Sequence, residues 1–245
     1  MNITNFRDLG GIINKDGKKV VSMRLFRSAE LSRLSDSCTL ALKNEYNLTT
    51  IIDFRSSYEI NQRPNISVEN SRYINIDILD GIAIDYIGYG DERLTGPLAR
   101  KHMNIFYHSF LKASPKYSHF FKEVLANKEG ALLFHCVHGK DRTGFGAALL
   151  LKALDVEDKV IFRDYMKTRS SRKEENLKTL EEYKNQGYTQ AQINGIEVLL
   201  SVDKLYLKSL FDTINKEFGS FHNYLAQELH ITPKEINQLK AMYLE

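Results

Sequence analysis

Residues 131–144 of the chain read ALLFHCVHGKDRTG. The first four of these residues are apolar, a short run that is typical of a strand buried inside a sheet. Thr143–Leu154 has the pattern of a helix, and the loop between strand and helix contains a cysteine, Cys136, and an arginine, Arg142. The order strand, loop and helix is a building unit of α/β folds.

The flanking sequence repeats this alternation. Other short apolar or β-branched runs have the length of strands and are bounded by polar residues: Val20–Phe26, Thr49–Phe54 and Arg72–Leu79. Helical spacing occupies Ser35–Tyr46 and Met103–Asn127, and the second of these is expected to restart at its internal proline. Strands that alternate with helices predict an α/β fold with a mostly parallel central sheet flanked by helices.

The chain after residue 143 shows only helical patterns. Thr189 and Gln192 have the spacing of a capping box, and so have Thr232 and Glu235. Gly219 follows a helical stretch and suits a left-handed helix end. We therefore expect a helical C-terminal part.

A length of 245 residues favours one large domain, since domains average about 150 residues. We expect a single domain over residues 1–245, with a helical C-terminal region at residues 157–245. Residues 80–101 mix several glycines and a proline with isoleucine and tyrosine, and they fit neither a strand nor a helix well. This segment is expected to be a mobile loop or a lid.

The composition is that of an ordinary globular protein, with 42% hydrophobic and 27% charged residues. Collagen-like, disordered and disulfide-scaffold classes are thereby excluded. The formal net charge of +3 is too small to indicate a nucleic-acid-binding protein, so no nucleic-acid partner is expected. Two cysteines, Cys38 and Cys136, cannot build a disulfide framework and favour a reducing compartment.

No apolar run approaches the ~18 residues that a transmembrane helix needs, so integral membrane association is not expected. The stretch MNITNFRD at the start of the sequence carries charges where a signal peptide needs its apolar core. A cytoplasmic location is therefore expected, while export by another route stays open.

The loop at residues 136–142 has the features of a phosphate-binding site. A loop that closes onto a helix N-terminus points backbone N–H groups at a common centre and adds the positive end of the helix dipole. Gly139 permits the backbone twist that turns successive amides inward, and Arg142 offers a planar fork for two phosphate oxygens. The positive end of the helix dipole also stabilises a thiolate at Cys136, and the hydroxyl of Thr143 can donate a hydrogen bond to this thiolate. The pattern predicts metal-independent transfer of a phosphoryl group to sulfur.

Other interpretations of these residues fit less well. A cysteine that follows an apolar strand is often only a buried, inert side chain, but the glycine, the arginine and the helix start at matching offsets favour a reactive one. His135, Cys136 and His138 could suggest zinc, yet no second cluster supplies further ligands at the usual spacing. A Walker loop requires Gly at 134 and Ser or Thr at 141, where this chain has Phe134 and Asp141.

The pattern His135-Cys136-x5-Arg142-Thr143-Gly144 resembles the signature of cysteine-dependent tyrosine and dual-specificity phosphatases. Its fuller form, HCVHGKDRTG, is similar to the loop of bacterial tyrosine and lipid phosphatases. Further segments of the chain resemble that family: residues 5–11, 25–28, 53–56, 164–166 and 218–220. The resemblance covers nearly the whole chain and implies a cysteine-phosphatase-like fold.

By this resemblance Cys136 is the nucleophile, Arg142 binds the phosphate, and Asp141 is the general acid that protonates the leaving oxygen. Phosphate contacts are expected from the remaining loop residues: Val137, His138, Gly139, Lys140 and Thr143. An acid on a separate loop is the alternative for Asp141, and the candidate lid offers three aspartates: Asp80, Asp85 and Asp91.

Several polar residues are expected to support the loop. His135 ends the predicted strand and faces the core, so it is expected to orient the loop. Asp53 and Arg55 lie at the end of another predicted strand, where α/β proteins place site residues, although a structural ion pair is equally consistent. A polar network that braces the loop is expected from three residues near the start of the chain: Arg7, Asp8 and Arg27.

The sequence is therefore expected to encode a phosphatase that acts through a phosphocysteine intermediate and needs no cofactor or metal. The expected substrates are phosphotyrosine proteins, with phosphoserine, phosphothreonine and phosphoinositides as further candidates, and the product is inorganic phosphate. Lys140 supports the phosphoinositide part, because lysine at this position resembles the phosphoinositide phosphatases. The alternatives are a rhodanese- or arsenate-reductase-like cysteine enzyme and a catalytically weak module that binds phosphorylated ligands.

Overall fold

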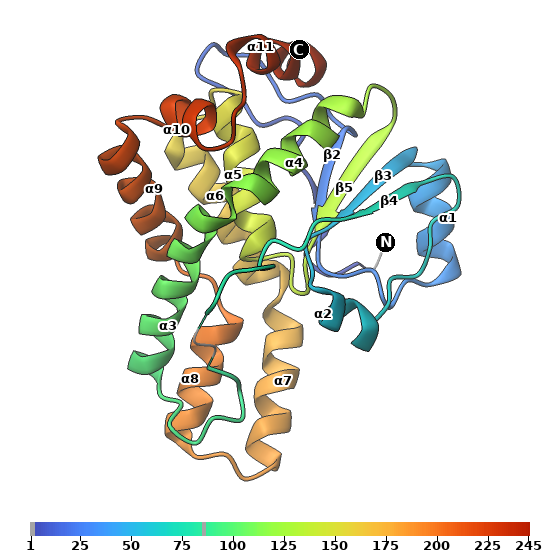
Figure 1. Ribbon diagram of the computed structural model, residues 1–245. Helices are drawn as coiled ribbons and strands as arrows, with labels where there is room; N and C mark the ends of the chain where they lie inside the picture. The colour runs from blue at the N-terminus through green and yellow to red at the C-terminus, as the bar shows by residue number, and fades with distance from the viewer. Residues whose placement is uncertain (1–2, 85–86) are drawn as a thin grey trace.

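The computed structural model describes residues 3–84 and 87–245, and within these residues five strands form one central sheet (Figure 1). In sheet order the strands are β1 (Arg7–Asp8), β2 (Leu25–Ser28), β5 (Ala131–His135), β3 (Leu48–Asp53) and β4 (Arg72–Asn75). Among these five, β1 is antiparallel to its neighbour and the other pairs are parallel. The mostly parallel sheet that the sequence predicts is thus confirmed.

The side chains of the central strands alternate between two cores of unequal size. On β5, Leu132 and Phe134 belong to the larger core, whereas Ala131 and Leu133 belong to the smaller one. This alternation follows from the two-residue period of a strand. Because both faces of the sheet are covered, every residue of β5 is buried, which explains the unbroken apolar run in the sequence.

The smaller core lies beneath α1 (Asp36–Asn44), which buries Cys38 and Leu42 against the sheet. The side chain of Ser35 caps this helix by accepting a hydrogen bond from the Cys38 amide. Helix α1 therefore covers one face of the sheet, and Cys38 fills space in its core (Figure 1).

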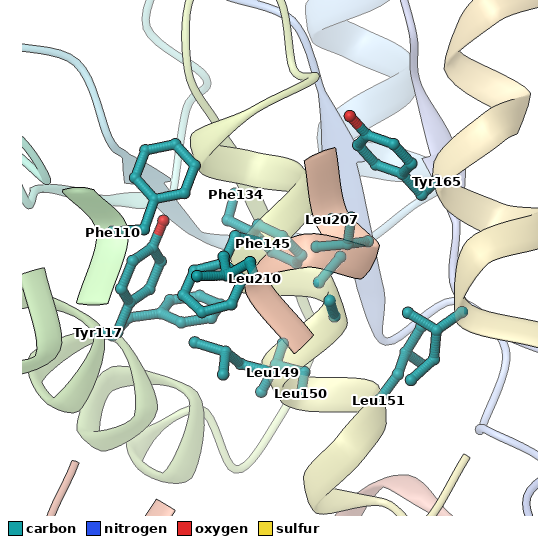
Figure 2. Close-up of a cluster of buried hydrophobic side chains, with 14 of the residues drawn as sticks. Phe110, Tyr117, Phe134, Phe145, Leu149, Leu150, Leu151, Tyr165, Leu207 and Leu210 are labelled. Carbon is teal, nitrogen blue, oxygen red and sulfur yellow. The ribbon is translucent and has the colours of Figure 1, made fainter. Parts of the chain in front are cut away.

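The larger core lies on the opposite face, beneath α4 (Ser114–Ala126) and α5 (Arg142–Ala153) (Figure 1). Figure 2 shows its centre, where Phe145 of α5 lies among other aromatic rings and the leucines of the same helix. The ring of Phe145 stacks on Phe110 at 5.8 Å and meets Tyr117 edge-on at 5.1 Å between ring centroids. This aromatic packing fixes α5 and hence the loop that precedes it.

A helical layer extends the larger core away from the sheet. It contains α3 (Gly96–Ser109), which continues through the short 3₁₀ helix η1 (Phe110–Ala113) into α4. The later helices are α6 (Asp158–Ser171), α7 (Lys173–Asn185), α8 (Gln190–Leu200), α9 (Lys204–Phe218), α10 (Phe221–Gln227) and α11 (Pro233–Tyr243). Helix α3 packs against α8 and α9, and in Figure 1 α3, α7 and α8 extend together below the sheet. No helix in the described part of the chain is both long enough and apolar enough to cross a membrane.

The helix ends that the sequence predicts in this layer are confirmed. Helices α8 and α11 begin with capping boxes, in which the side chains of Thr189 and Thr232 each accept a bond from a backbone amide of the first turn. Helix α9 ends at Gly219, whose φ of 76° is left-handed.

Two strands are shorter than the sequence predicts. The first expected strand begins only at Leu25, because Met23 adopts a left-handed φ of 63° that interrupts the extended backbone. The strand expected at Arg72–Leu79 ends at Asn75, after which the side chain of Asp77 stabilises a turn by accepting a bond from a backbone amide.

The helix expected from Met103 begins earlier, at Gly96, inside the candidate lid at residues 80–101. Thr95 is its N-cap and Pro97 lies in its first turn. A threonine followed closely by proline is a common signal of a helix start, so the sequence holds the information that places this boundary.

Replacing Phe145 with alanine tests whether the aromatic cluster holds α5 in place. Phe145 is fully buried, so its truncation removes apolar contacts and leaves a cavity. We expect the free energy of unfolding, measured by urea denaturation, to fall by about 3–5 kcal/mol. Leu205→Ala on α9 is the control, because Leu205 is 65% exposed and its loss should cost less than about 0.5 kcal/mol. Equal losses for the two variants would contradict the structural role of Phe145.

Candidate active site

The parallel strands β2, β5 and β3 end at the same edge of the sheet, and the candidate loop leaves from there. Ser28 of β2 and Asp53 of β3 both lie opposite His135 of β5. Ligand sites of α/β proteins usually lie beyond the carboxyl ends of such strands. The loop from Cys136 to Asp141 starts at this edge and runs directly into α5.

The backbone at Gly139 gives the loop its tight course. Its φ of +62° lies in the left-handed region, which favours glycine. A Cβ atom at this position would lie 2.2 Å from the carbonyl oxygen of Ser28. The dihedral angle and the close approach to β2 therefore both require glycine here.

The carbonyl oxygens of the loop are held outward by hydrogen bonds. The amide of Glu30 donates to the carbonyl oxygen of Val137 at 3.1 Å, and Asn5 Nδ2 donates to that of His138 at 3.1 Å. The carbonyl oxygen of Gly139 accepts from Asn5 at 2.8 Å and from Arg27 at 2.9 Å. In the part of the chain that the structure describes, the backbone amides of residues 137–142 have no protein acceptor. These amides and the N-terminus of α5 make a cradle for an anion.

Asp164 of α6 anchors the residues that hold the loop. Its carboxylate pairs with Arg27 at 2.9 Å and with Arg7 at 2.8 Å. Arg7 in turn donates to Asn5 Oδ1 at 2.5 Å, which orients the Asn5 amide toward the loop. Burial alone would raise the pKa of Asp164, but the positive charges of Arg27 and Arg7 outweigh burial and lower this pKa.

The polar network expected from Arg7, Asp8 and Arg27 is therefore only partly present at the loop. Asp8 accepts hydrogen bonds from the amides of Gly10 and Met23 instead. It stabilises the turn that precedes β2 and does not join the network around Asp164.

Cys136 is buried, with 2% of its surface exposed, at the point where β5 enters the loop. The hydroxyl oxygen of Thr143 is also buried and has no hydrogen-bond partner among the described residues. A buried hydroxyl without a partner is costly, which makes Thr143 available to a group that binds or forms in the loop. Tyr117 donates to the carbonyl oxygen of Arg142 at 3.0 Å and fixes the start of α5.

The guanidinium group of Arg142 forms a two-pronged ion pair with Glu59. Nη1 and Nη2 lie 2.7 and 2.8 Å from the two carboxylate oxygens of Glu59. Burial works to lower the pKa of Arg142, but its hydrogen bonds to Glu59 dominate and raise it. Burial likewise works to raise the pKa of Glu59, and the bonds from Arg142 lower it. Both groups are therefore charged at neutral pH.

Sequence reasoning missed Glu59, although a signal for it exists. Glu59 lies in α2 (Ser57–Gln62), and its side chain also completes a capping box with Ser56. The spacing Ser-x-x-Glu after a predicted strand marks such a helix start. The position of Glu59 at the beginning of α2 follows from this box.

Asp141 precedes α5, but its side chain does not cap the helix. One carboxylate oxygen, Oδ1, accepts a hydrogen bond from the hydroxyl of Tyr107 at 2.7 Å, and Oδ2 lies 3.5 Å from Nζ of Lys140. The side chain keeps 14% of its surface exposed. Asp141 can therefore reach a substrate that binds to the loop.

The described aspartates of the candidate lid have other partners. Asp80 forms an ion pair with Lys116 of α4 at 2.7 Å. Hydrogen bonds from Arg93 lower the pKa of Asp91 to about 2, and its carboxylate is engaged by the Arg93 guanidinium. Asp85, the third alternative acid, lies outside the described residues. The contacts around Asp80 and Asp91 favour Asp141 as the acid.

Lys140 is buried and points toward the helical layer. Its ammonium group donates to the carbonyl oxygens of Leu199 and Ser201 at the C-terminal end of α8, the second at 2.9 Å. Burial lowers the pKa of Lys140. Lys140 thus ties the loop to α8, a role that the sequence did not suggest.

His138 is half-buried among cations. Burial, followed by the positive charges of Arg172, Lys140 and Arg142, lowers the pKa of His138 well below its usual value. The imidazole is therefore neutral at physiological pH and adds no positive charge to the loop.

His135, Asp53 and Arg55 form a buried network that is joined by Asn65. Nδ1 of His135 lies 3.2 Å from the carbonyl oxygen of Cys136, and Nε2 lies 3.0 Å from Nδ2 of Asn65. Arg55 donates to both carboxylate oxygens of Asp53 and to Oδ1 of Asn65. Burial lowers the pKa of His135, so the ring is neutral. This geometry corresponds to the structural ion pair that was the alternative for Asp53 and Arg55.

No group of three or more histidine, cysteine, aspartate or glutamate side chains within residues 3–84 and 87–245 is arranged to hold a metal ion. The site described above combines the loop, the buried thiol of Cys136, the cations Lys140 and Arg142, and the carboxylates of Asp141 and Glu59.

Comparisons with known proteins identify the family of the chain. A family model described as the tyrosine phosphatase family matches residues 1–245. A Cupriavidus necator protein named as a tyrosine-protein phosphatase is 30% identical over 245 residues, which cover 99% of this chain and 86% of that protein. The triple specificity protein phosphatase PtpB of Mycobacterium tuberculosis is 26% identical over 254 residues, which cover 90% of this chain and 91% of that protein.

Among solved structures, the catalytic domain of the PP-IP phosphatase Siw14 of Saccharomyces cerevisiae covers 88% of this chain. The match covers 95% of that chain, with 15% identity and a TM-score of 0.39. The family model spans the whole chain, and the identity of 30% extends along almost all of it. The chain belongs to the tyrosine phosphatase family.

Proposed function

We propose that this protein hydrolyses phosphotyrosine in proteins by transferring the phosphoryl group first to Cys136 and then to water. The observation that carries the proposal is the presence of Cys136, Asp141 and Arg142 on one anion cradle at the N-terminus of α5. Membership of the tyrosine phosphatase family supplies the reaction class. The contacts of each side chain support its individual role.

Substrate binding depends on Arg142 and the loop amides. Glu59 occupies Nη1 and Nη2 of Arg142, so the side edge of the guanidinium with Nε can bind phosphate oxygens. The same ion pair fixes the plane of the guanidinium before the substrate arrives, so less conformational entropy is lost on binding. The amides of residues 137–142 surround the remaining phosphate oxygens.

In the first step Sγ of Cys136 forms a bond to phosphorus while the bond from phosphorus to the tyrosine oxygen breaks. Asp141, protonated at this stage, gives its proton to that oxygen, so that tyrosine leaves as a neutral phenol. In the second step Asp141, now ionised, accepts a proton from the water molecule that attacks phosphorus. The bond between sulfur and phosphorus breaks, inorganic phosphate leaves, and the buried Thr143 hydroxyl donates to the returning thiolate.

The proposal extends to phosphoserine, phosphothreonine and phosphoinositides as further substrates, because the mycobacterial relative is named a triple specificity protein phosphatase. Lys140 does not support the phosphoinositide part in the way the sequence suggests, because its ammonium group binds carbonyl oxygens of α8 and is not free to meet a second phosphate. The two alternatives, a sulfur- or arsenate-transferring enzyme and a module that only binds phosphorylated ligands, are not favoured by the family match.

Cys136→Ser tests the nucleophile. We expect turnover of para-nitrophenyl phosphate to fall by ~10³-fold or more, because the weaker nucleophile cannot replace the thiolate. Binding of inorganic phosphate, measured by calorimetry, should persist because the amides and Arg142 form the cradle without the sulfur. Wild-type turnover should be the same with and without EDTA. Substantial turnover by the serine variant would rule out Cys136 as the nucleophile.

Asp141→Asn tests the general acid. A poor leaving group needs the proton and a good one does not, so kcat/KM should fall by ~10²–10⁴-fold on phenyl phosphate and much less on para-nitrophenyl phosphate. Asp80→Asn and Asp91→Asn are matched controls with no expected effect. If Asp141→Asn retains full activity on phenyl phosphate and a change at Asp80, Asp85 or Asp91 removes it, the acid lies on the candidate lid.

Lys140→Met tests the substrate range. Lys140 binds α8 and not a second phosphate, so its loss should change kcat/KM for a phosphotyrosine peptide and for a short-chain phosphoinositide by the same factor, within about 2-fold. Both substrates are measured at one ionic strength. A desolvated contact to a second phosphate is worth up to ~3 kcal/mol, or ~100-fold. A selective loss of about 5-fold or more on the phosphoinositide would show that Lys140 binds the lipid head group.

A further inference from the structure

Two buried tyrosine hydroxyls form a hydrogen-bonded chain behind the carboxyl group of Asp141. Tyr107 of α3 donates to Oδ1 of Asp141 at 2.7 Å, and its oxygen lies 2.5 Å from the hydroxyl oxygen of Tyr165 of α6. Because the single hydroxyl hydrogen of Tyr107 goes to the carboxylate, Tyr165 is the donor to Tyr107. The chain therefore runs in one direction, from Tyr165 through Tyr107 to Asp141.

The ring of Tyr107 has little freedom to move. Tyr107 is completely buried, and its ring centroid lies 5.3 Å from that of Phe110 and 5.4 Å from that of Tyr206 on α9. Tyr165 contacts it edge-on at 6.4 Å. Helices α3, α6 and α9 thus hold the hydroxyl at a fixed place beside the loop, and a rigid donor of this kind can fix the orientation of a carboxyl group.

The glycine that ends the loop signature makes room for this chain. A Cβ atom at Gly144 would lie 3.1 Å from both Cδ2 and Cε2 of Tyr165, closer than side chains normally pack. Glycine at this position therefore lets the Tyr165 ring lie against α5. In Figure 2 the Tyr165 ring lies at the side of the core cluster, with its hydroxyl pointing away from Leu151.

Both tyrosine hydroxyls keep their protons at neutral and moderately alkaline pH. Burial, followed by the negative charge of Asp141, raises the pKa of Tyr107 and of Tyr165 well above the usual value. Neither hydroxyl can therefore take the proton of Asp141. Oδ1 of Asp141 stays an acceptor of a hydrogen bond, which leaves Oδ2 to carry the proton.

We infer that Tyr107, supported by Tyr165, is a positioning residue for the general acid: it holds Oδ1 of Asp141 so that the proton on Oδ2 faces the leaving oxygen. The inference rests on the proposed function of Asp141 as the acid. Nothing in the loop signature itself reveals this residue, because Tyr107 lies on a helix 34 residues earlier in the chain.

Tyr107→Phe removes the hydroxyl and keeps the ring, so it tests the inference directly. We expect kcat/KM for phenyl phosphate to fall about 10-fold, less than for Asp141→Asn, and kcat/KM for para-nitrophenyl phosphate to fall less than 2-fold. The lost hydroxyl stabilises the ionised carboxylate. Its removal should therefore move the decline of kcat/KM at high pH upward by about one pH unit.

Other titratable or charged groups surround Asp141 and are unchanged in this variant. They are Lys140 and Arg142 on the loop and its helix, Tyr117 on α4, Tyr165 on α6, Arg172 after α6, and Tyr206 on α9. The shift in the pH profile can therefore be assigned to the missing hydroxyl of Tyr107.

Tyr243→Phe is the matched control. Tyr243 is equally buried and donates to the carbonyl oxygen of Val124 at 2.9 Å, near the C-terminal end of α4 and about two turns beyond Tyr117. This variant should lose stability to urea without any dependence of kcat/KM on the leaving group. The double variant Tyr107→Phe/Asp141→Asn should be no slower on phenyl phosphate than Asp141→Asn alone, because both changes act on one group.

The outcomes separate this inference from the assignment of the acid. If Asp141→Asn shows the leaving-group dependence and Tyr107→Phe slows both substrates equally with an unchanged pH profile, Tyr107 is only structural and the inference is overturned. If Asp141→Asn shows no such dependence, the acid assignment fails and the inference fails with it. Leaving-group dependence in both variants and a shifted profile in Tyr107→Phe support it.

Discussion

The anion cradle depends on the outward orientation of its carbonyl oxygens. Asn5 and Arg27 bind the carbonyl of Gly139 from behind. If that peptide rotated, a carbonyl oxygen would face the phosphate and repel it, and an amide would lose its role as a donor. Arg27 can be buried at this place only because Asp164 neutralises its charge. The proposed binding of phosphate to the loop thus depends on an ion pair that does not itself contact the phosphate.

The same principle recurs on the other sides of the site. Two cations beside the loop are each fixed by a partner outside the loop. Glu59 orients Arg142 and leaves its Nε edge available to the substrate, and carbonyl oxygens at the end of α8 hold Lys140. Fixed dipoles and charges need little reorganisation when negative charge moves from the substrate to the leaving oxygen. The ion pairs and hydrogen bonds around the loop therefore serve mainly to orient the few charged groups that the loop contains.

The spacing of residues in the sequence predicts those features that depend on interactions between near neighbours in the chain. The capping boxes at Thr189 and Thr232, the buried strand and the loop itself all follow from residues close together in the chain. Tyr107 contacts the loop, and Asp164 binds the arginines that hold it, from helices that only the tertiary structure brings near. In the sequence, a single tyrosine on an apolar helix face has the appearance of a core residue. Glu59 combines the two cases. Its capping box with Ser56 can be recognised from the spacing in the sequence, whereas its ion pair with Arg142 cannot. The early start of α3 can also be recognised in the sequence, from Thr95 and Pro97.

The residues that hold the loop and its supporting arginine lie far from their partners along the sequence, and are therefore synthesised at different times. Asn5 and Gly139 are 134 positions apart, and Arg27 and Asp164 are 137 apart. A contact between such distant residues requires both of them to be present and must close a long stretch of chain, which costs conformational entropy. A nascent chain on the ribosome therefore carries Arg27 without its counter-ion until α6 has emerged. Reactivity toward phosphate esters consequently arises only after most of the polypeptide has been made.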